Sequence, residues 1–263
     1  MQTVKLNNGV EIPILGFGVF QIADPAECER SVVDAIEVGY THIDTAASYM
    51  NEEAVGRGIK QSGVAREKLF ITTKLWIQSD GYENTLKAFE RSLKRLQVEY
   101  IDLYLIHWPG TGVKYEEAFR ALNKLVRDGK VKHLGVSNFK LKLLKQSQEL
   151  SETPLITNQV PYSLPDKTYV ENGVLEHCQK NNISLTAYSP IKFRSMNTNK
   201  TLGTIAEAHS ATPYQIALAW LVMQPRVITI PMSFNPQHIR ENFDAADIEL
   251  TESEMSQLSN AWH

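Results

Sequence analysis

The sequence predicts an α/β fold of the (β/α)8, or TIM, barrel class, formed by one domain that spans residues 1–263. Short apolar runs rich in β-forming residues recur about every 30 residues, which is the length of one strand–helix unit. Segments with helical periodicity lie between these runs. The runs are almost continuously apolar, as expected for parallel strands that helices cover. An open, doubly wound sheet is the alternative, but the regular repetition of eight units favours closure.

Each barrel strand corresponds to one apolar run. The eight predicted strands are LGFGV at 15–19, HIDTA at 42–46, LFITTKL at 69–75, YIDLYLIHW at 100–108, HLGVSN at 133–138, LITNQV at 155–160, ISLTAYSP at 183–190 and VITIPM at 227–232. A predicted helix at 25–39 has Pro25 near its start and Gly39 at its end. Residues 4–13, VKLNNGVEIP, predict a β-hairpin with an Asn-Gly turn, which we expect to close the barrel floor.

Composition and charge exclude several classes of protein. The net charge of −3 offers no general attraction for nucleic acid or an anionic membrane. The apolar run IALAWLVM is far shorter than the ~20 residues of a membrane span, and the N-terminus has no signal-peptide pattern. Cys28 and Cys178 fall in helical segments and are expected to be reduced thiols that are buried or half-buried. We therefore expect a cytoplasmic protein, and a monomer because no long apolar surface stripe stands out.

Familiar cofactor and metal motifs are missing from the sequence. Gly16 and Gly18 form a GxG pair, but Gln21 follows where a Rossmann fingerprint needs glycine. The seven histidines show no HxH or HExxH spacing, which argues against a metal-dependent hydrolase.

Polar side chains stand where the predicted strands end, the position at which barrel enzymes perform their chemistry. The second strand ends at Asp44 with Tyr49 on its loop, the third at Lys74 and the fourth at His107. Each residue has a structural alternative: Asp44 as a helix cap, Lys74 as a surface-reaching cation, His107 as an ordinary hydrogen-bonded histidine, and Tyr49 as a surface aromatic. Together, an acid, a base and an imidazole on three consecutive strands indicate a shared site.

The chemistry of this group suits protonation of a carbonyl oxygen. A cation about 4 Å from a phenol is worth roughly 4 kcal/mol at an effective dielectric near 20, or about three pKa units before desolvation is subtracted. Lys74, held by Asp44, would thus lower the pKa of Tyr49 and make it a proton donor, while His107 would orient the substrate oxygen or share its proton. No side chain supplies an attacking group, so we expect a cofactor.

The motifs HIDTAASYMNEE, ITTKLW, LYLIHWP, GVSNF, NQVPY, AYSP and IPMSFNPQHIREN, in this order, resemble the aldo-keto reductase family, and especially small prokaryotic members similar to 2,5-diketogluconate reductases. The resemblance implies reduction of a small-molecule aldehyde or ketone with NADPH or NADH. It also implies a tetrad in which Tyr49 is the general acid, Lys74 its activator, Asp44 the anchor of Lys74, and His107 the residue that orients the carbonyl.

The resemblance further implies where the cofactor and substrate bind. Nicotinamide would stack on Tyr188, and its carboxamide would contact Ser137, Asn138 and Gln159. The other expected cofactor contacts are Ser189, Ile191, Arg194, Pro231, Met232, Ser233, His238, Glu241 and Asn242. Lys192 is a further candidate anion contact, with a solvated loop charge as the alternative for it and for Arg194. Phe20, Trp76 and Trp108 would line the substrate pocket, with simple packing at the barrel mouth as the alternative.

One departure from the family pattern affects cofactor choice. Similar proteins carry IPKS after the last strand and an arginine further on, and these two cations flank the 2′-phosphate of NADPH. Here those positions are Met232 and His238, and Arg240 lies ~200° around the helix from His238. We therefore expect that NADH is accepted.

Two rival functions remain open from the sequence. A Schiff-base enzyme of the same fold would use Lys74 as nucleophile, but this lysine would have to be neutral, which Asp44 opposes. A non-catalytic barrel that binds the dinucleotide as a sensor is the second rival, and the intact tetrad argues against it.

Overall fold

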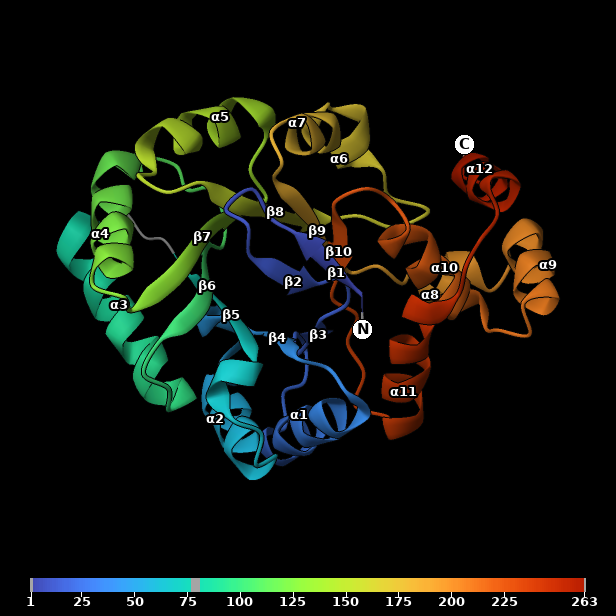
Figure 1. The fold of residues 1–263 in the computed structure, drawn as a ribbon, viewed down its shortest axis with the longest axis horizontal. Coiled ribbons are helices and arrows are strands. Elements are labelled where there is room, and N and C mark those ends of the chain that lie inside the picture. Colours follow the sequence, from blue (N-terminus) through green and yellow to red (C-terminus); the bar gives the residue numbers. More distant parts are fainter. Residues whose placement is uncertain (1, 77–80, 263) are drawn as a thin grey trace.

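The computed structural model describes residues 2–76 and 81–262, except for the side chains of residues 193 and 194. Eight parallel strands run in sequence order around the structure (Figure 1). Their bounds are β3 Phe17–Gly18, β4 His42–Asp44, β5 Phe70–Leu75, β6 Ile101–Ile106, β7 Val131–Ser137, β8 Leu155–Pro161, β9 Ser184–Tyr188 and β10 Val227–Thr229. Each overlaps one of the predicted apolar runs, with β7 beginning two residues before its run and β8 ending one residue after its run, so the eight predicted strands are confirmed.

The barrel is closed by hydrogen bonds between its first and last strands. Leu15 and Thr229 form a parallel bridge, in which the Gly16 N–H donates to the Thr229 carbonyl at 2.8 Å. The Gly18 N–H donates to the Pro231 carbonyl at 3.0 Å, which extends this seam toward the carboxyl ends of the strands. A Cβ on Gly18 would lie 2.8 Å from the Ile230 carbonyl oxygen, so this close approach requires glycine. The alternative of an open sheet is therefore wrong.

Helices surround the barrel between the strands (Figure 1). The described helices are α1 Pro25–Val38, α2 Glu52–Gln61, α3 Gly81–Leu96, α4 Tyr115–Arg127, α5 Leu141–Leu150, α6 Thr168–Glu171, α7 Val174–Lys180, α8 Phe193–Met196, α9 Lys200–Ala208, α10 Pro213–Val222, α11 Pro236–Asp244 and α12 Glu252–Asn260, with short 3₁₀ helices η1 Ala47–Tyr49, η2 Arg66–Lys68 and η3 Ala245–Asp247. The predicted ends of the first helix are confirmed. Asp24 accepts the Glu27 N–H at its start, and Gly39 ends it with φ of 124°.

A β-hairpin covers the amino-terminal end of the barrel, as predicted. Its strands are β1 Thr3–Lys5 and β2 Glu11–Pro13. Leu6 and Ile12 pack on apolar side chains from β6, β8 and β10, namely Leu103, Leu105, Ile156 and Ile228. The turn differs from a two-residue Asn-Gly turn, because the Gly9 N–H donates to Leu6 and Gly9 takes the left-handed conformation after it. The hairpin leaves the opposite end of the barrel free for a site.

Three smaller findings bear on the protein class. No helix in the described part of the chain is long and apolar enough to cross a membrane. Cys28 lies in α1 and Cys178 in α7, and both thiols are buried, as predicted. Among the residues that the structure describes, no group of three or more His, Cys, Asp or Glu side chains could hold a metal ion.

Candidate active site

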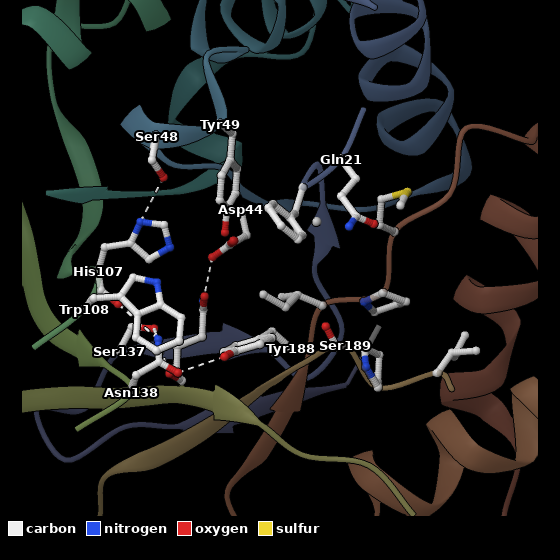
Figure 2. Close-up of a pocket in the computed structure, with 18 of the residues that line it drawn as sticks. Gln21, Asp44, Ser48, Tyr49, His107, Trp108, Ser137, Asn138, Tyr188 and Ser189 are labelled. Carbon is white, nitrogen blue, oxygen red and sulfur yellow. Dashed lines mark hydrogen bonds between the residues drawn. The ribbon is translucent and has the colours of Figure 1, made fainter. Parts of the chain in front are cut away.

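A pocket of about 450 Å³ lies at the carboxyl ends of the strands, a volume typical of small-molecule sites. The side chains of Tyr49, His107 and Tyr188 border it (Figure 2). The structure brings together in its lining the predicted residues Phe20, Asp44, Tyr49, Trp76, His107, Trp108, Ser137, Asn138, Gln159, Tyr188, Ser189, Ile191, Pro231 and Met232. Lys74 is fully buried beside Tyr49.

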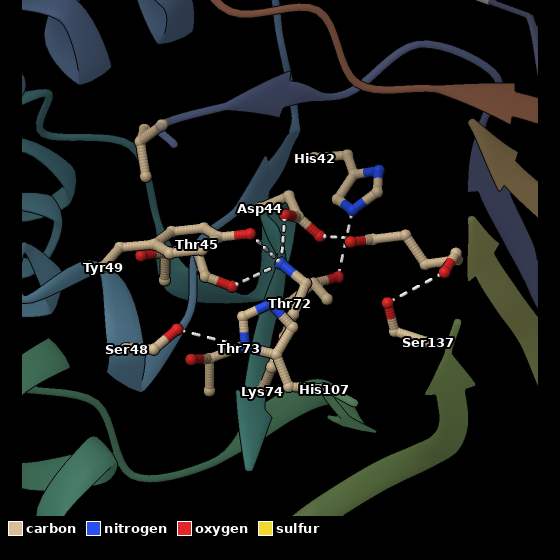
Figure 3. A network of polar contacts seen from close by, with 12 residues as sticks. His42, Asp44, Thr45, Ser48, Tyr49, Thr72, Thr73, Lys74, His107 and Ser137 are labelled. Carbon is tan, nitrogen blue, oxygen red and sulfur yellow. Dashed lines mark hydrogen bonds and ion pairs between the residues drawn. The ribbon is translucent and has the colours of Figure 1, made fainter. Parts of the chain in front are cut away.

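The ammonium group of Lys74 is the centre of the polar network behind this pocket (Figure 3). Its Nζ donates to Asp44 Oδ1 at 2.5 Å, to the Thr45 carbonyl at 2.8 Å and to the Tyr49 hydroxyl at 3.3 Å. An ammonium has three protons, and here each has an acceptor. The parallel register explains the meeting, because β4 pairs with β5 and the two strands end side by side. Lys74 therefore does not reach the surface.

Asp44 is held from a second side as well. Its Oδ2 accepts from Gln159 Nε2 at 2.8 Å, so a strand-end amide from β8 supports the carboxylate that pairs with Lys74. Burial lowers the pKa of Lys74, but the charge of Asp44 and the contact with Tyr49 outweigh it, and the net pKa is raised. Lys74 is thus charged near neutral pH, which disfavours the Schiff-base rival. Asp44 does not cap α2, whose first residue follows Asn51.

The pKa of Tyr49 is raised above its usual value, and here the expectation from the sequence is wrong. Burial of the phenol raises the pKa more than the Lys74 charge lowers it. The sequence shows that the cation Lys74 is present, but it does not show how deeply the Tyr49 phenol is buried. Tyr49 is therefore protonated at neutral pH, and because its oxygen accepts from Lys74, its own proton remains available to a group in the pocket.

His107 is neutral at neutral pH. Burial, aided by the nearby charge of Lys74, lowers its pKa to about 3. Its ring makes edge contacts with Tyr49 and Trp76, with centroids 5.5 Å and 5.6 Å away. Nδ1 lies 3.1 Å from the Ser48 hydroxyl, so one ring nitrogen has a protein partner and the other does not among the described residues.

The ends of β7, β8 and β9 form the opposite wall. Ser137 Oγ donates to the Gln159 carbonyl at 2.8 Å, and the Tyr188 hydroxyl donates to Asn138 Oδ1 at 2.8 Å. Asn138 and Ser189 have positive φ values of 65° and 49°, a strained conformation that occurs often at binding sites.

This wall fits a flat ring that bears an amide. Tyr188 offers an aromatic face, and Gln159 Oε1 has no hydrogen-bond partner in the described part of the chain. Asn138 Oδ1 keeps a second lone pair after its bond to Tyr188. These acceptors suit the amide N–H group of a nicotinamide.

One edge of the pocket is formed by Ile230, Pro231 and Met232, which lie between β10 and α11. Met232 is half-buried at the pocket edge, and His238 is exposed on the first turn of α11. The Arg240 guanidinium donates to the Val38 carbonyl at 3.4 Å, so it points toward the end of α1. Ser233, His238, Glu241 and Asn242 lie outside the pocket lining, which leaves their predicted cofactor contacts as predictions. The side chain of Arg194 lies outside the described residues, and Lys192 is exposed.

The pocket lining also contains residues that sequence reasoning missed. They are Gly18, Gln21, Ser48, Pro190 and Ile230. Ser48 precedes Tyr49 directly, so its place on a strand-end loop was a usable signal. Its neutral hydroxyl stands out less in the sequence than the ionisable and aromatic side chains around it.

Comparisons with known proteins agree with this geometry. The model of the Aldo/keto reductase family matches residues 14–263. The glyoxal reductase of Bacillus subtilis (strain 168) is 47% identical over 256 residues, which cover 97% of this chain and 91% of that protein. A solved structure of a candidate 2,5-diketo-D-gluconic acid reductase B has a TM-score of 0.93 at 36% identity, covering 100% of this chain and 92% of that one. An aldo-keto reductase of Bombyx mori in complex with NADP has a TM-score of 0.89 at 32% identity, covering 99% and 92%.

The family match covers almost the whole barrel and both halves of the pocket. It confirms the resemblance that the strand-end motifs indicated, including the similarity to 2,5-diketogluconate reductases. Since relatives of the same fold hold NADP, a nicotinamide cofactor accounts for the attacking group that the side chains lack. The chain therefore belongs to the aldo-keto reductase family and is an NAD(P)H-dependent oxidoreductase that reduces carbonyl groups.

Proposed function

We propose that Tyr49 is the general acid of this reductase and that Lys74, Asp44 and His107 support it. The single observation that carries the proposal is the position of the Tyr49 hydroxyl, which accepts from a fully buried, charged lysine and faces the pocket. When bound, the reduced nicotinamide supplies a hydride to the carbonyl carbon. Tyr49 gives its proton to the carbonyl oxygen.

Each supporting residue has one task in this proposal. As Tyr49 loses its proton, Lys74 stabilises the phenolate through the hydrogen bond that already joins them. Asp44 keeps Lys74 charged and in place. The neutral imidazole of His107 donates a hydrogen bond to the same carbonyl oxygen, which positions it beside the phenol.

We propose that nicotinamide stacks on Tyr188 with its carboxamide at Ser137, Asn138 and Gln159. The rest of the dinucleotide would extend past Ser189, Ile191 and Pro231 toward α11, where the other predicted contacts lie. No Lys or Arg side chain of the described pocket lining stands at the far end, and Arg240 points elsewhere. This supports acceptance of NADH as well as NADPH.

The substrates we propose are small, neutral aldehydes and ketones, with broad selection among them. Phe20, Trp76 and Trp108 surround the pocket mouth and are about half exposed, at 51%, 49% and 46%. In the described lining the one carboxylate, Asp44, is paired with Lys74, and His107 is neutral. A substrate carboxylate would therefore find no cation there. We further propose that the chain acts as a single-domain monomer in the cytoplasm.

The experiment is a panel of carbonyl compounds assayed with both reduced nicotinamides, read by the loss of nicotinamide absorbance. We expect turnover of glyoxal-type and aromatic aldehydes, weaker turnover of keto acids, and activity with both cofactors. Binding of the dinucleotide without turnover of any carbonyl would support the sensor rival instead. A hundred-fold preference for NADPH would contradict the cofactor proposal alone.

A further inference from the structure

Ser48 directly precedes Tyr49, the proposed acid, and its side chain lies close to His107, which also faces the pocket. It is the middle residue of η1, directly before Tyr49, and it lines the pocket. Its hydroxyl lies 3.1 Å from Nδ1 of His107. Figure 2 shows Ser48 on one side of the imidazole, while the other ring nitrogen faces the pocket. The roles proposed above leave Ser48 unused.

The two partners of this contact are fixed by their surroundings. In the loop, the Tyr49 N–H donates to the Ala46 carbonyl at 3.0 Å, and Thr45 Oγ1 donates to Asn51 Oδ1 at 2.9 Å. Across the pocket, the His107 N–H donates to the Leu75 carbonyl at 3.0 Å. Since both backbones are held, the distance between hydroxyl and imidazole is set by the fold.

Asn138, which directly follows β7, also holds the backbone of His107 at the end of β6. Its Nδ2 donates to the His107 carbonyl at 3.2 Å. His107 is buried, with a side chain that packs between Tyr49 and Trp76. The imidazole therefore has little freedom to exchange the positions of its two nitrogens.

A neutral imidazole carries one proton, and only one of its two tautomers can serve the carbonyl. If Nδ1 carries the proton, the nitrogen toward the pocket is Nε2 with a lone pair, which repels a carbonyl oxygen. If Nε2 carries the proton, it donates to the carbonyl, and Nδ1 then needs a donor of its own. In the described part of the chain, Ser48 is the side chain that meets Nδ1.

We propose that Ser48 is a positioning residue whose hydroxyl donates to Nδ1 of His107 and so holds the imidazole in the tautomer with its proton on Nε2. The short helix η1 then carries both Tyr49, the proposed acid, and Ser48, which orients His107 as the second donor to the substrate oxygen. This inference rests on the proposed role of His107 in carbonyl reduction. It adds a role for Ser48 that acts through His107 and not on the substrate.

The test compares Ser48→Ala with Ser48→Thr, which keeps the hydroxyl, and with Ser253→Ala, an exposed serine on α12. The first readout is the ¹⁵N chemical shifts of labelled histidine, assigned to His107 by the loss of its signals in His107→Gln. The wild type and Ser48→Thr should show a protonated Nε2 and a lone pair on Nδ1 at neutral pH. Ser48→Ala should show a mixture of tautomers.

The second readout is steady-state kinetics with a neutral aldehyde. Ser48→Ala should lower kcat by about 10- to 100-fold, the scale for a weakened donor to a developing oxyanion, with KM little changed. Ser48→Thr should recover most of kcat, and Ser253→Ala should match the wild type.

Two results would overturn the inference: a wild-type His107 with its proton on Nδ1, or a Ser48→Ala variant whose tautomer is unchanged, whatever its rate. The spectra do not need turnover. A protein that reduces no carbonyl but loses the Nε2–H tautomer in Ser48→Ala would refute the proposed function and leave the tautomer assignment standing.

Discussion

The two ends of the pocket are built in different ways. Around Lys74 the polar groups are buried and partnered, with Asp44 bonded to both Lys74 and Gln159. At the other edge of the pocket Met232 is half-buried, and beyond the lining, on α11, His238 is exposed and Arg240 bonds to the end of α1. A buried charge network tolerates few substitutions because each member supports another. An exposed contact tolerates change, so we infer that the reaction is constrained and the cofactor choice is adjustable.

Removing the buried cation Lys74 should have the largest effect on stability and on activity. In Lys74→Met, Asp44 becomes a buried carboxylate without a counter-ion, which costs about 3–5 kcal/mol of unfolding free energy. Carbonyl reduction should fall at least about 10³-fold, since the phenolate loses its hydrogen-bond donor. Denaturant unfolding and kcat measure the two effects.

A double variant, Lys74→Met with Asp44→Asn, separates them. It should recover much of the lost stability because the uncompensated charge is gone, yet it should remain inactive. Recovery of activity together with stability would show that Lys74 has only a structural role.

Adding positive charge at Met232 and His238 should increase the preference for NADPH over NADH. Met232→Lys with His238→Arg should raise kcat/KM for NADPH by about 10- to 100-fold through charge-assisted bonds to the 2′-phosphate, with NADH little affected. Met223→Lys is the control, because it adds a lysine at an exposed methionine outside the pocket lining. The gain should shrink at high salt. An equal gain for both cofactors would contradict the placement of the phosphate.

Buried histidines should make the barrel sensitive to acid. Burial lowers the pKa of His42 to about 4 and that of His107 to about 3. Both contribute stability that is fully present above the unfolded pKa near 6.5 and is lost progressively as pH falls from there to the folded values. The free energy of unfolding should drop by about 2 kcal/mol for each histidine near pH ~4.5. His42→Gln should reduce this slope, whereas His238→Gln, at the exposed end, should keep it.

The pH dependence of the rate should be the smallest effect. In the proposed mechanism reduction needs Tyr49 protonated, and burial raises its pKa above the usual value of 10.0. Activity should therefore be lost only as pH rises through that raised value. Since His107 stays neutral down to a pKa of about 3, kcat should vary little between about pH 6 and 9. An alkaline limb that begins near neutral pH would show that Lys74 outweighs burial after all.

The sequence predicted the barrel and the buried end of the pocket for one physical reason. Parallel strands that helices cover must be apolar along their length, so Asp44, Lys74 and His107 stand out where the strands end. Topology then brings these ends together without further information. The hairpin over the barrel floor was predicted from local sequence alone, namely the Asn-Gly pair in residues 4–13.

Other features depend on distances that a sequence does not contain. Three contacts join segments that lie far apart in the chain. They are the hydrogen bonds that Gly18 allows between the first and last strands, the contact of Ser48 with His107, and the hydrogen bond from Gln159 to Asp44. The raised pKa of Tyr49 depends on the depth of its burial. The balance between two opposing effects could not be settled from residue types.

The measurement that tests the central claim most directly is the reduction rate of Tyr49→Phe, which removes the proposed proton donor and keeps the ring. The control is Tyr100→Phe, which removes a hydroxyl at the amino-terminal end of β6. We expect kcat for a neutral aldehyde to fall by about 10²- to 10⁴-fold in Tyr49→Phe, with dinucleotide binding retained, and to be unchanged in the control. Full reductase activity in Tyr49→Phe would contradict the account.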